Sequence, residues 1–251
     1  MALTLALVTT LIGTLFTLAV FVQYLSRRKP YQLVWTLGLL LYTVGAFLWF
    51  LREAVGMSGA IFRLWYLTGA MLVPAYLGTG TLWLLAPRGF SRWATIVLAL
   101  VSVVALALVL SVSLRSPLTN LLDSNALTAK DPVTGASFFP AYVVVLTILL
   151  NTYGTIALVG GALWSVWQAW RQRQAVGGPT ARRRAFCNSL IAVGAILPAL
   201  GGSLEATKIA QPHLWMLLIG LVVLFAGFLA STEVFERRAF PSWLFGKGSA
   251  A

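Results

Sequence analysis

Residues 93–114 read WATIVLALVSVVALALVLSVSL, a continuous apolar stretch that contains no charged side chain. A helix needs about 20 apolar residues to cross the hydrocarbon layer of a bilayer, which is roughly 30 Å thick. A transmembrane β-strand would instead be about 10 residues long and would alternate apolar with polar side chains. The stretch therefore predicts a membrane-spanning helix.

Six further stretches have the same character, so the sequence predicts an all-α integral membrane protein, a bundle of seven transmembrane helices. Of all residues 59% are hydrophobic and 10% are charged, against about a quarter charged in soluble proteins. The first stretch lacks the basic start of a signal peptide and is read as a true span. The predicted spans are Leu3–Leu25, Gln32–Leu51, Ala60–Ala86, Trp93–Leu114, Phe139–Trp170, Ala185–Thr207 and His213–Phe235.

Basic residues predict the orientation of the bundle, because cytoplasmic loops of membrane proteins carry an excess of Lys and Arg. The net charge is +12, which would suggest nucleic-acid binding in a soluble protein. Most of the 18 basic residues lie on alternate loops, however, and this disfavours nucleic acid as a partner. Those on the side predicted to be cytoplasmic are Arg27, Arg28, Lys29, Arg88, Arg92, Arg171, Arg173, Arg182, Arg183, Arg184, Arg237, Arg238 and Lys247.

This charge pattern places the N-terminus outside and the C-terminus in the cytoplasm. Residues 1–238 then form one seven-helix transmembrane domain of a multi-pass plasma-membrane protein, and residues 239–251 form a short cytoplasmic tail. The lipid bilayer is the first partner that this implies. The cluster Arg182, Arg183 and Arg184 fixes topology in the simpler interpretation; in the other, this basic face also binds anionic lipid headgroups or an acidic partner protein.

Glycines recur seven residues apart in four of the predicted spans. Seven residues make nearly two helical turns, so both members of a pair lie on one face of their helix. Missing side chains let a neighbouring helix approach closely there, and helix packing is the favoured interpretation. The pairs are Gly38 with Gly45, Gly154 with Gly161, Gly194 with Gly201, and Gly220 with Gly227.

Prolines interrupt the third and sixth spans at Pro74 and Pro198, and each is expected to kink its helix and free a carbonyl that needs another partner. The surrounding residues are alike: Gly69-Ala-Met-Leu-Val-Pro74-Ala-Tyr-Leu-Gly78 and Gly194-Ala-Ile-Leu-Pro198-Ala-Leu-Gly201. The two spans run in opposite directions. A common ancestry would indicate an inverted repeat of the transporter kind with a site near the kinks, whereas chance similarity around a proline is the simpler interpretation.

Ionisable residues inside membrane spans are costly and are candidates for function. Here they gather at the predicted outer helix ends: Arg52, Glu53, Arg63, Glu205 and Lys208. One interpretation is a set of ion pairs that holds helix ends together. The other is an outward-facing pocket for a polar or charged ligand, which the aromatic residues of the same region would also line. Those aromatic residues are Tyr42, Trp49, Trp65, Tyr66 and Tyr76.

The fifth span carries a polar stretch, Asn151, Thr152, Tyr153 and Thr155, that must find hydrogen bonds inside the bundle. The sequence shows no recognisable set of catalytic residues. The chain has one histidine and one cysteine, no group of residues with metal-site spacing, and no nucleophile with an evident base. We therefore expect no catalytic residue, no metal and no cofactor, and a protein that is not an enzyme.

Three short pieces of the sequence resemble the seven-helix membrane region at the N-terminus of many bacterial sensor histidine kinases. They are Tyr42-Thr-Val-Gly-Ala-Phe-Leu-Trp49, the stretch from Gly69 to Pro74, and Ile196-Leu-Pro198-Ala-Leu-Gly201. The resemblance implies a region that senses a ligand or the state of the membrane and passes a signal inward. No kinase or cyclase domain follows the last span, so a partner protein is expected to carry the output.

The sequence thus favours a non-enzymatic, receptor-like sensor or accessory subunit that binds a small ligand or partner through the outer polar and aromatic residues. The alternative is a small transporter or channel with a site near the middle of the membrane, at Pro74 and Pro198.

Overall fold

The computed structural model describes residues 1–114, 138–176, 186–187, 189–198 and 212–230, and every regular element among them is helical. Five helices are long and apolar enough to cross a membrane: Ala2–Arg27, Pro30–Val55, Gly59–Leu85, Arg88–Ser111 and Ala141–Gln168. Two shorter apolar helices, Ser189–Pro198 and His213–Leu229, lie within the sixth and seventh predicted spans. Residues 185, 188 and 199–207 of the sixth predicted span and 231–235 of the seventh lie outside the described residues.

The helices follow one another along the chain with short connections in the first half. In chain order they are α1 (Ala2–Arg27), α2 (Pro30–Val55), α3 (Gly59–Trp65), the π-helical η1 (Tyr66–Leu72), α4 (Val73–Leu85), α5 (Arg88–Ser111), α8 (Ala141–Thr155), the π-helical η2 (Ile156–Gly160), α9 (Gly161–Val176) and α11 (Pro212–Leu229).

Local sequence explains the sharp ends of the first helices. Arg28 follows α1 with a φ of 52°, and its N–H donates to the Tyr24 carbonyl, so the helix closes in a left-handed turn. Pro30 opens α2 in a first turn that needs no N–H from it. Gly56 follows α2 with a φ of 93°, and Ser58 caps α3 by accepting from the Ile61 N–H. These signals produce tight antiparallel connections.

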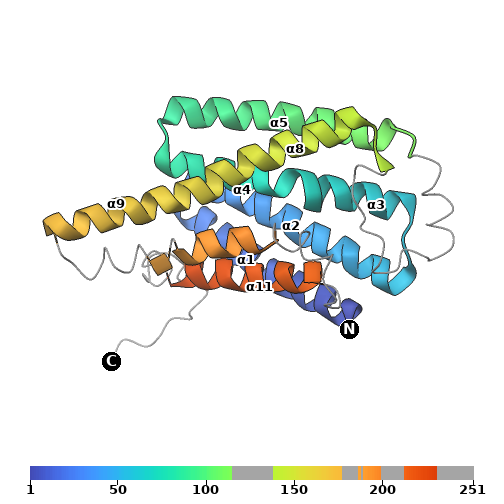
Figure 1. Ribbon diagram of the computed structural model, residues 1–251, viewed down its shortest axis with the longest axis horizontal. Helices are drawn as coiled ribbons and strands as arrows, with labels where there is room; N and C mark the ends of the chain where they lie inside the picture. The colour runs from blue at the N-terminus through green and yellow to red at the C-terminus, as the bar shows by residue number, and fades with distance from the viewer. Residues whose placement is uncertain (115–137, 177–185, 188, 199–211, 231–251) are drawn as a thin grey trace.

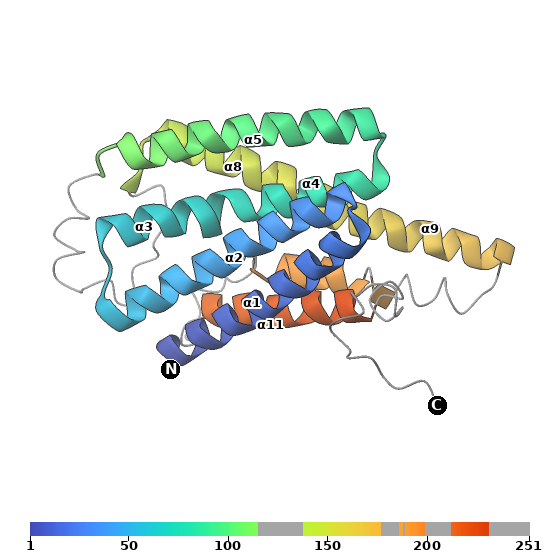
Figure 2. The same cartoon turned by 180° about the vertical axis from the view of Figure 1, so that it is seen from behind.

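The bundle has two large apolar cores on either side of the α3–η1–α4 helix. One joins this helix to α5 and α8, with Phe62, Met71 and Phe139 fully buried. The other joins α1, α2, α4 and α11, with Phe16 and Val20 at its centre. A third, small cluster joins Ala2 and Leu5 of α1 to Leu214 of α11. Figures 1 and 2 show the same order, with α5 and α8 on one side of α3 and α4, and α1 and α11 on the other.

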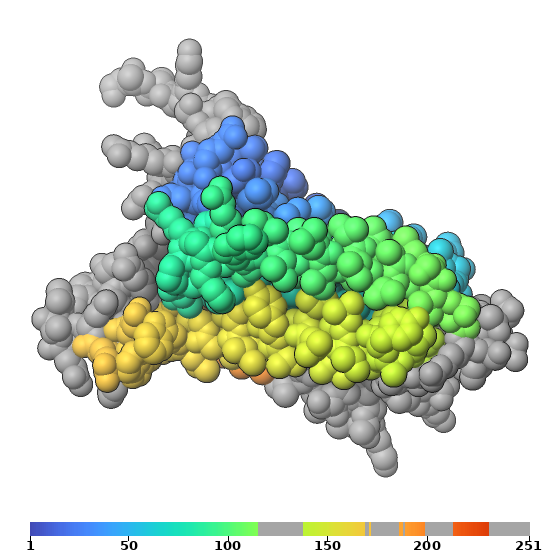
Figure 3. Space-filling model, turned by 90° about the horizontal axis from the view of Figure 1, so that it is seen from above, coloured from blue at the N-terminus to red at the C-terminus, as the bar shows by residue number. Residues whose placement is uncertain are grey.

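The outermost helix is α5, which lies beside α8 and α9 over one face (Figure 3). In its most apolar stretch of 18 residues, only 17% is buried inside the structure, against 50% in the corresponding stretch of α2. Large side chains on its outer side, such as Leu100 and Val103, are well exposed. An exposed apolar face of this length is typical of a helix that contacts lipid.

The fifth predicted span continues beyond Trp170, because α8, η2 and α9 run without a break from Ala141 to Val176. The end of α9 projects away from the other helices (Figure 1). On it the rings of Trp164 and Trp167 lie 4.7 Å apart, and the Arg171 guanidinium stacks 4.0 Å over Trp167. This cation–π contact places a positive charge against an aromatic ring on the projecting helix.

Helix packing at the paired glycines is confirmed wherever the structure describes them. A Cβ added to Gly45 would lie 2.9 Å from the Cα of Gly69, and one added to Gly194 would lie 2.7 Å from the carbonyl oxygen of Gly220. Such distances leave no room for a side chain. Neighbouring helices occupy the space beside the other described glycines in the same way, at Gly38, Gly154, Gly161 and Gly227. Gly201 lies outside the described residues.

Candidate ligand cavity

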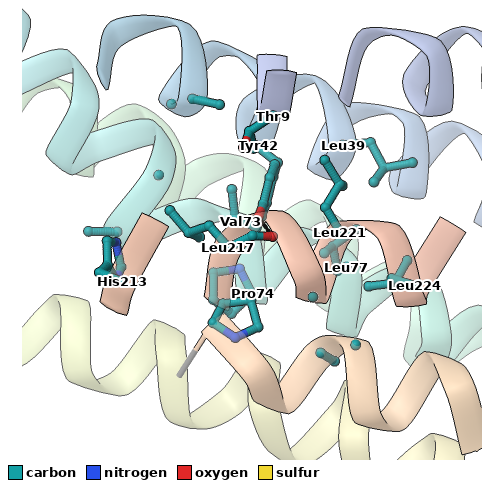
Figure 4. Close-up of a pocket in the computed structure, with 18 of the residues that line it drawn as sticks. Thr9, Leu39, Tyr42, Val73, Pro74, Leu77, His213, Leu217, Leu221 and Leu224 are labelled. Atoms are coloured by element: carbon teal, nitrogen blue, oxygen red, sulfur yellow. Dashed lines mark hydrogen bonds between the residues drawn. The ribbon is translucent and has the colours of Figure 1, made fainter. Parts of the chain in front are cut away.

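A cavity of about 390 Å³ lies between the helices, a volume within the range of small-molecule sites. Its walls come from α1, α2, the α3–η1–α4 helix, α8 with η2, the helix Ser189–Pro198 and α11. Figure 4 shows it as a long space, with His213 near one end and Leu224 near the other. Both interrupting prolines, Pro74 and Pro198, line it.

Pro74 shapes the wall because it has no N–H to donate to the Ala70 carbonyl one turn before it. The side chain of Asn151 in α8 takes that place: its Nδ2 donates to the Ala70 oxygen at 2.8 Å and to the Thr147 oxygen at 3.0 Å. The expectation that the freed carbonyl finds another partner is thus confirmed. Asn151 Oδ1 remains as an acceptor on the cavity wall.

The chain before Pro74 widens into the π-helical segment η1, so the interruption of the third span is a change of helix type as well as a proline. Gly69 and Ala70 of this segment line the cavity. A second π-helical segment, η2, follows α8 without any proline. Helix interruptions of this kind are frequent at functional sites.

One end of the cavity is aromatic. The Trp49 ring lies 5.1 Å from the Trp65 ring in an edge-to-face arrangement and 5.6 Å from the His213 ring. Within the described residues, Trp49 Nε1 and His213 Nδ1 are both buried without a hydrogen-bond partner. Buried polar atoms without partners are rare and costly, so this end of the cavity holds hydrogen-bonding capacity that the described chain does not use.

The other end is aliphatic. Leu39 from α2, Leu77 from α4, and Leu221 and Leu224 from α11 form its wall (Figure 4). Small residues bring the surrounding backbones together there: the ring of Pro198 packs against Gly220, with its Cδ 2.8 Å from where a Cβ would stand. The cavity is therefore polar and aromatic at one end and purely aliphatic at the other.

Tyr42 crosses from α2 to α11 beside the cavity, where its hydroxyl donates to the Leu217 carbonyl at 2.8 Å (Figure 4). We expect Tyr42→Phe to lower the free energy of unfolding by about 1 kcal/mol, the usual net value of one hydrogen bond. Chemical unfolding of the purified protein measures this. Tyr24→Phe, near the end of α1 and away from the cavity, is the control, and an equal loss in both variants would contradict the assignment.

The structure separates the residues that the sequence grouped into one outer site. Tyr42, Trp49 and Trp65 line the cavity together with Pro74 and Pro198. The other described members of the group have other contacts and do not line it: Arg52, Glu53, Arg63, Tyr66 and Tyr76.

Those contacts explain the separation. Arg52 lies 3.9 Å from Glu53 and stacks 4.7 Å over the outer side of the Trp49 ring. Arg63 donates to the Val109 carbonyl near the end of α5. The Tyr66 and Tyr76 hydroxyls hydrogen-bond Thr147 and Ser102, on α8 and α5.

The remaining sequence-predicted residues, Glu205, Lys208, Arg182, Arg183 and Arg184, lie outside the described residues. Sequence reasoning missed His213, which it counted only as the single histidine in arguing against a metal site. A signal was present in the sequence. His213 lies at the start of the last span and Trp49 near the end of the antiparallel second span, so the two residues are expected at the same depth.

Comparison with known proteins adds no relative, since no protein-family model, no curated protein and no solved structure matches the chain. The site must be interpreted from its own chemistry. Among the described lining residues the polar groups are hydroxyls, an amide, two indoles and one imidazole, with no carboxylate, lysine or arginine. No group of three or more His, Cys, Asp or Glu with metal-binding geometry occurs in the described chain. This arrangement can bind and orient a molecule.

Proposed function

We propose that this protein is a non-enzymatic, receptor-like sensor or accessory subunit of the plasma membrane that binds a small ligand in the cavity. The observation that carries the proposal is the cavity itself, whose wall includes Trp49 and His213, two residues whose buried Nε1 and Nδ1 have no hydrogen-bond partner in the described chain. Nearly all buried polar groups in proteins have partners. A ligand bound beside these two rings would supply the missing partners and fill the space between the helices.

The proposal includes seven membrane spans with the N-terminus outside and the C-terminus in the cytoplasm. The order of the described helices supports it: the α1–α2 and α4–α5 connections, which carry Arg27, Arg28, Lys29 and Arg88, lie at the end of the bundle where α9 projects (Figure 1). The aromatic end of the cavity lies toward the opposite end, where the N-terminus is found. Under the positive-inside rule the cavity then faces outward.

Single cysteines test this orientation in a variant that lacks Cys187. We expect Val55→Cys, exposed at the end of α2, to react with a membrane-impermeant maleimide in intact cells. Gly89→Cys, in the α4–α5 region where nothing lies within 4 Å of an added Cβ, should react only after the cells are permeabilised. The reverse pattern of labelling would overturn the proposed orientation.

Ligand binding is tested with purified protein in lipid nanodiscs, screened for small molecules that raise its unfolding temperature. Binding to the native state stabilises a protein by mass action. We expect Ala195→Leu, which fills part of the cavity, to abolish the stabilisation by any hit. Val193→Leu, on the exposed side of the same helix, should keep it. A hit that both variants retain binds elsewhere and does not support the proposal.

A partner protein on the cytoplasmic side is proposed to carry the output, and anionic lipid is proposed to contact the basic Arg182, Arg183 and Arg184. The projecting α9, with its Trp167–Arg171 stack, is the described element best placed for such a contact. Copurification of partners with the full chain, compared with a variant in which Arg171 is replaced by Glu, tests this part.

A transporter is the second candidate function, and one observation favours it: Pro74 and Pro198, from spans that run in opposite directions, line the same cavity. Reconstituted vesicles discriminate between the two. If a molecule that binds the cavity is also accumulated or released across the bilayer at a rate that Ala195→Leu abolishes, the protein is a transporter. Binding without flux supports the receptor-like function.

A further inference from the structure

The polar end of the cavity sets the chemistry of the group that binds there. The indole Nε1 of Trp49 is a donor only, so it needs an acceptor, whereas His213 Nδ1 can donate or accept depending on its tautomer. The two ring centroids lie 5.6 Å apart, and neither nitrogen has a partner in the described chain. A hydroxyl group bound at this end can satisfy both kinds of nitrogen, because its oxygen accepts from an N–H and its O–H donates to an imidazole nitrogen.

The opposite end sets the rest of the molecule. Leu39, Leu77, Leu221 and Leu224 surround it, and none of them offers a hydrogen-bonding side chain. A polar group placed there would lose its hydration without compensation. The cavity thus selects a molecule with one polar end, oriented toward His213, and an aliphatic body that reaches toward Leu224 (Figure 4).

The described residues of the wall carry no charged side chain. Arg52 is the nearest cation in the described chain, but its guanidinium stacks on Trp49 and pairs with Glu53 instead of lining the cavity. A carboxylate or an ammonium group would have to give up water at a depth where ionised groups are strongly disfavoured. The desolvation free energy of an uncharged polar group is much smaller, and hydrogen bonds to Trp49 and His213 offset it.

From these three features we infer that the ligand is an uncharged, mainly aliphatic molecule with a single oxygen-bearing end, such as a fatty alcohol, and that this end binds between Trp49 and His213. The inference rests on the proposed function, since it assigns a ligand class to the same cavity. It differs from the polar or charged ligand of the sequence-based hypothesis, because Arg52, Glu53 and Arg63, the described charged residues of the outer cluster, do not line the space.

Photolabelling of the full chain in nanodiscs tests the inference. The probe is a ten-carbon alcohol with a diazirine in its chain, and labelled peptides are identified by mass spectrometry. Competitors of the same length are decan-1-ol, decane, decanoate and decylammonium. Labelling of α5, which contributes no residue to the cavity, reports probe that is merely dissolved in lipid. Labelling of α2 and α11 is expressed relative to it.

We expect cavity labelling that decan-1-ol displaces about tenfold better than decanoate, decylammonium or decane, since one hydrogen bond or one desolvated charge is worth about a factor of ten. In Trp49→Phe, which keeps the ring but removes the N–H, decan-1-ol should lose most of its advantage over decane. Trp93→Phe, on the exposed face of α5, should change nothing.

The possible outcomes separate the two proposals. If decanoate or decylammonium competes as well as the alcohol, the ligand class is wrong while the cavity remains a binding site. If no competitor reduces labelling of α2 and α11 relative to α5, the cavity does not bind this class at all, and the screen with Ala195→Leu then decides the proposed function independently. The comparison among competitors uses the unaltered protein, so it stands even where a variant fails to fold.

Discussion

Gly154→Ala should lower the free energy of unfolding by about 3 kcal/mol or more, the upper range for overpacking a tight contact. A Cβ at this position would stand 2.1 Å from the carbonyl carbon of Pro74, 2.3 Å from its oxygen and 2.5 Å from the Ala75 nitrogen. All three are backbone atoms, so no side chain can rotate away. The α8 helix would have to move off the α4 helix. Chemical unfolding of the purified protein in detergent measures the loss.

Gly160→Ala provides the matched control. Gly160 lies six residues further along the same continuous helix, and nothing lies within 4 Å of a Cβ added there. The substitution should leave stability unchanged or raise it by as much as about 1 kcal/mol, because alanine favours a helix over glycine. Equal losses in the two variants would show that helix propensity, and not contact with Pro74, governs this helix.

Asn151→Leu should cost about 2 kcal/mol, because it leaves the Ala70 carbonyl without the donor that replaces the missing N–H of Pro74. Leucine has nearly the same shape and fills the same space. The effect should therefore come from the unpaired carbonyl. Unfolding measurements on single and double variants test this assignment.

Pro74→Ala supplies the comparison, since alanine at 74 restores an N–H that can donate to the Ala70 carbonyl. In that background Asn151→Leu should cost about 1 kcal/mol or less, so the two substitutions are strongly non-additive. An equal cost of Asn151→Leu with Pro74 and with Ala at this position would mean that the side-chain hydrogen bond does not compensate for the proline.

Helix type and packing glycines are readable from the sequence because both depend on local composition. Residues 93–114 are too apolar for any other interpretation, and paired glycines seven residues apart necessarily share a face. Depth along a helix is equally accessible. The sequence groups Trp49 and Trp65 in the same outer region, and the centroids of their rings lie 5.1 Å apart.

Direction around the helix axis is what the sequence does not reveal. Trp65 lines the cavity, whereas Tyr66, one residue later and about 100° around the helix, turns to Thr147 on α8. Pro74 lines it, whereas Tyr76 two residues later contacts Ser102 on α5. In apolar spans every face is apolar, so no periodicity marks the face that turns inward. The π-helical η1 further shifts the angular register by an amount that no residue pattern shows.

The elements α8, η2 and α9 form one continuous helix that links the cavity wall to the projecting end of α9. At 1.5 Å per residue, Arg171 lies about 30 Å along the axis from Asn151 on the cavity wall. Gly154 packs tightly against the Pro74 backbone, so we expect the helix to pivot at this residue. Arg171 lies about 25 Å beyond Gly154, so a tilt of about 5° there displaces Arg171 by about 2 Å. A change of shape too small to disturb the core near Asn151 thus becomes a clear displacement at the far end of the helix.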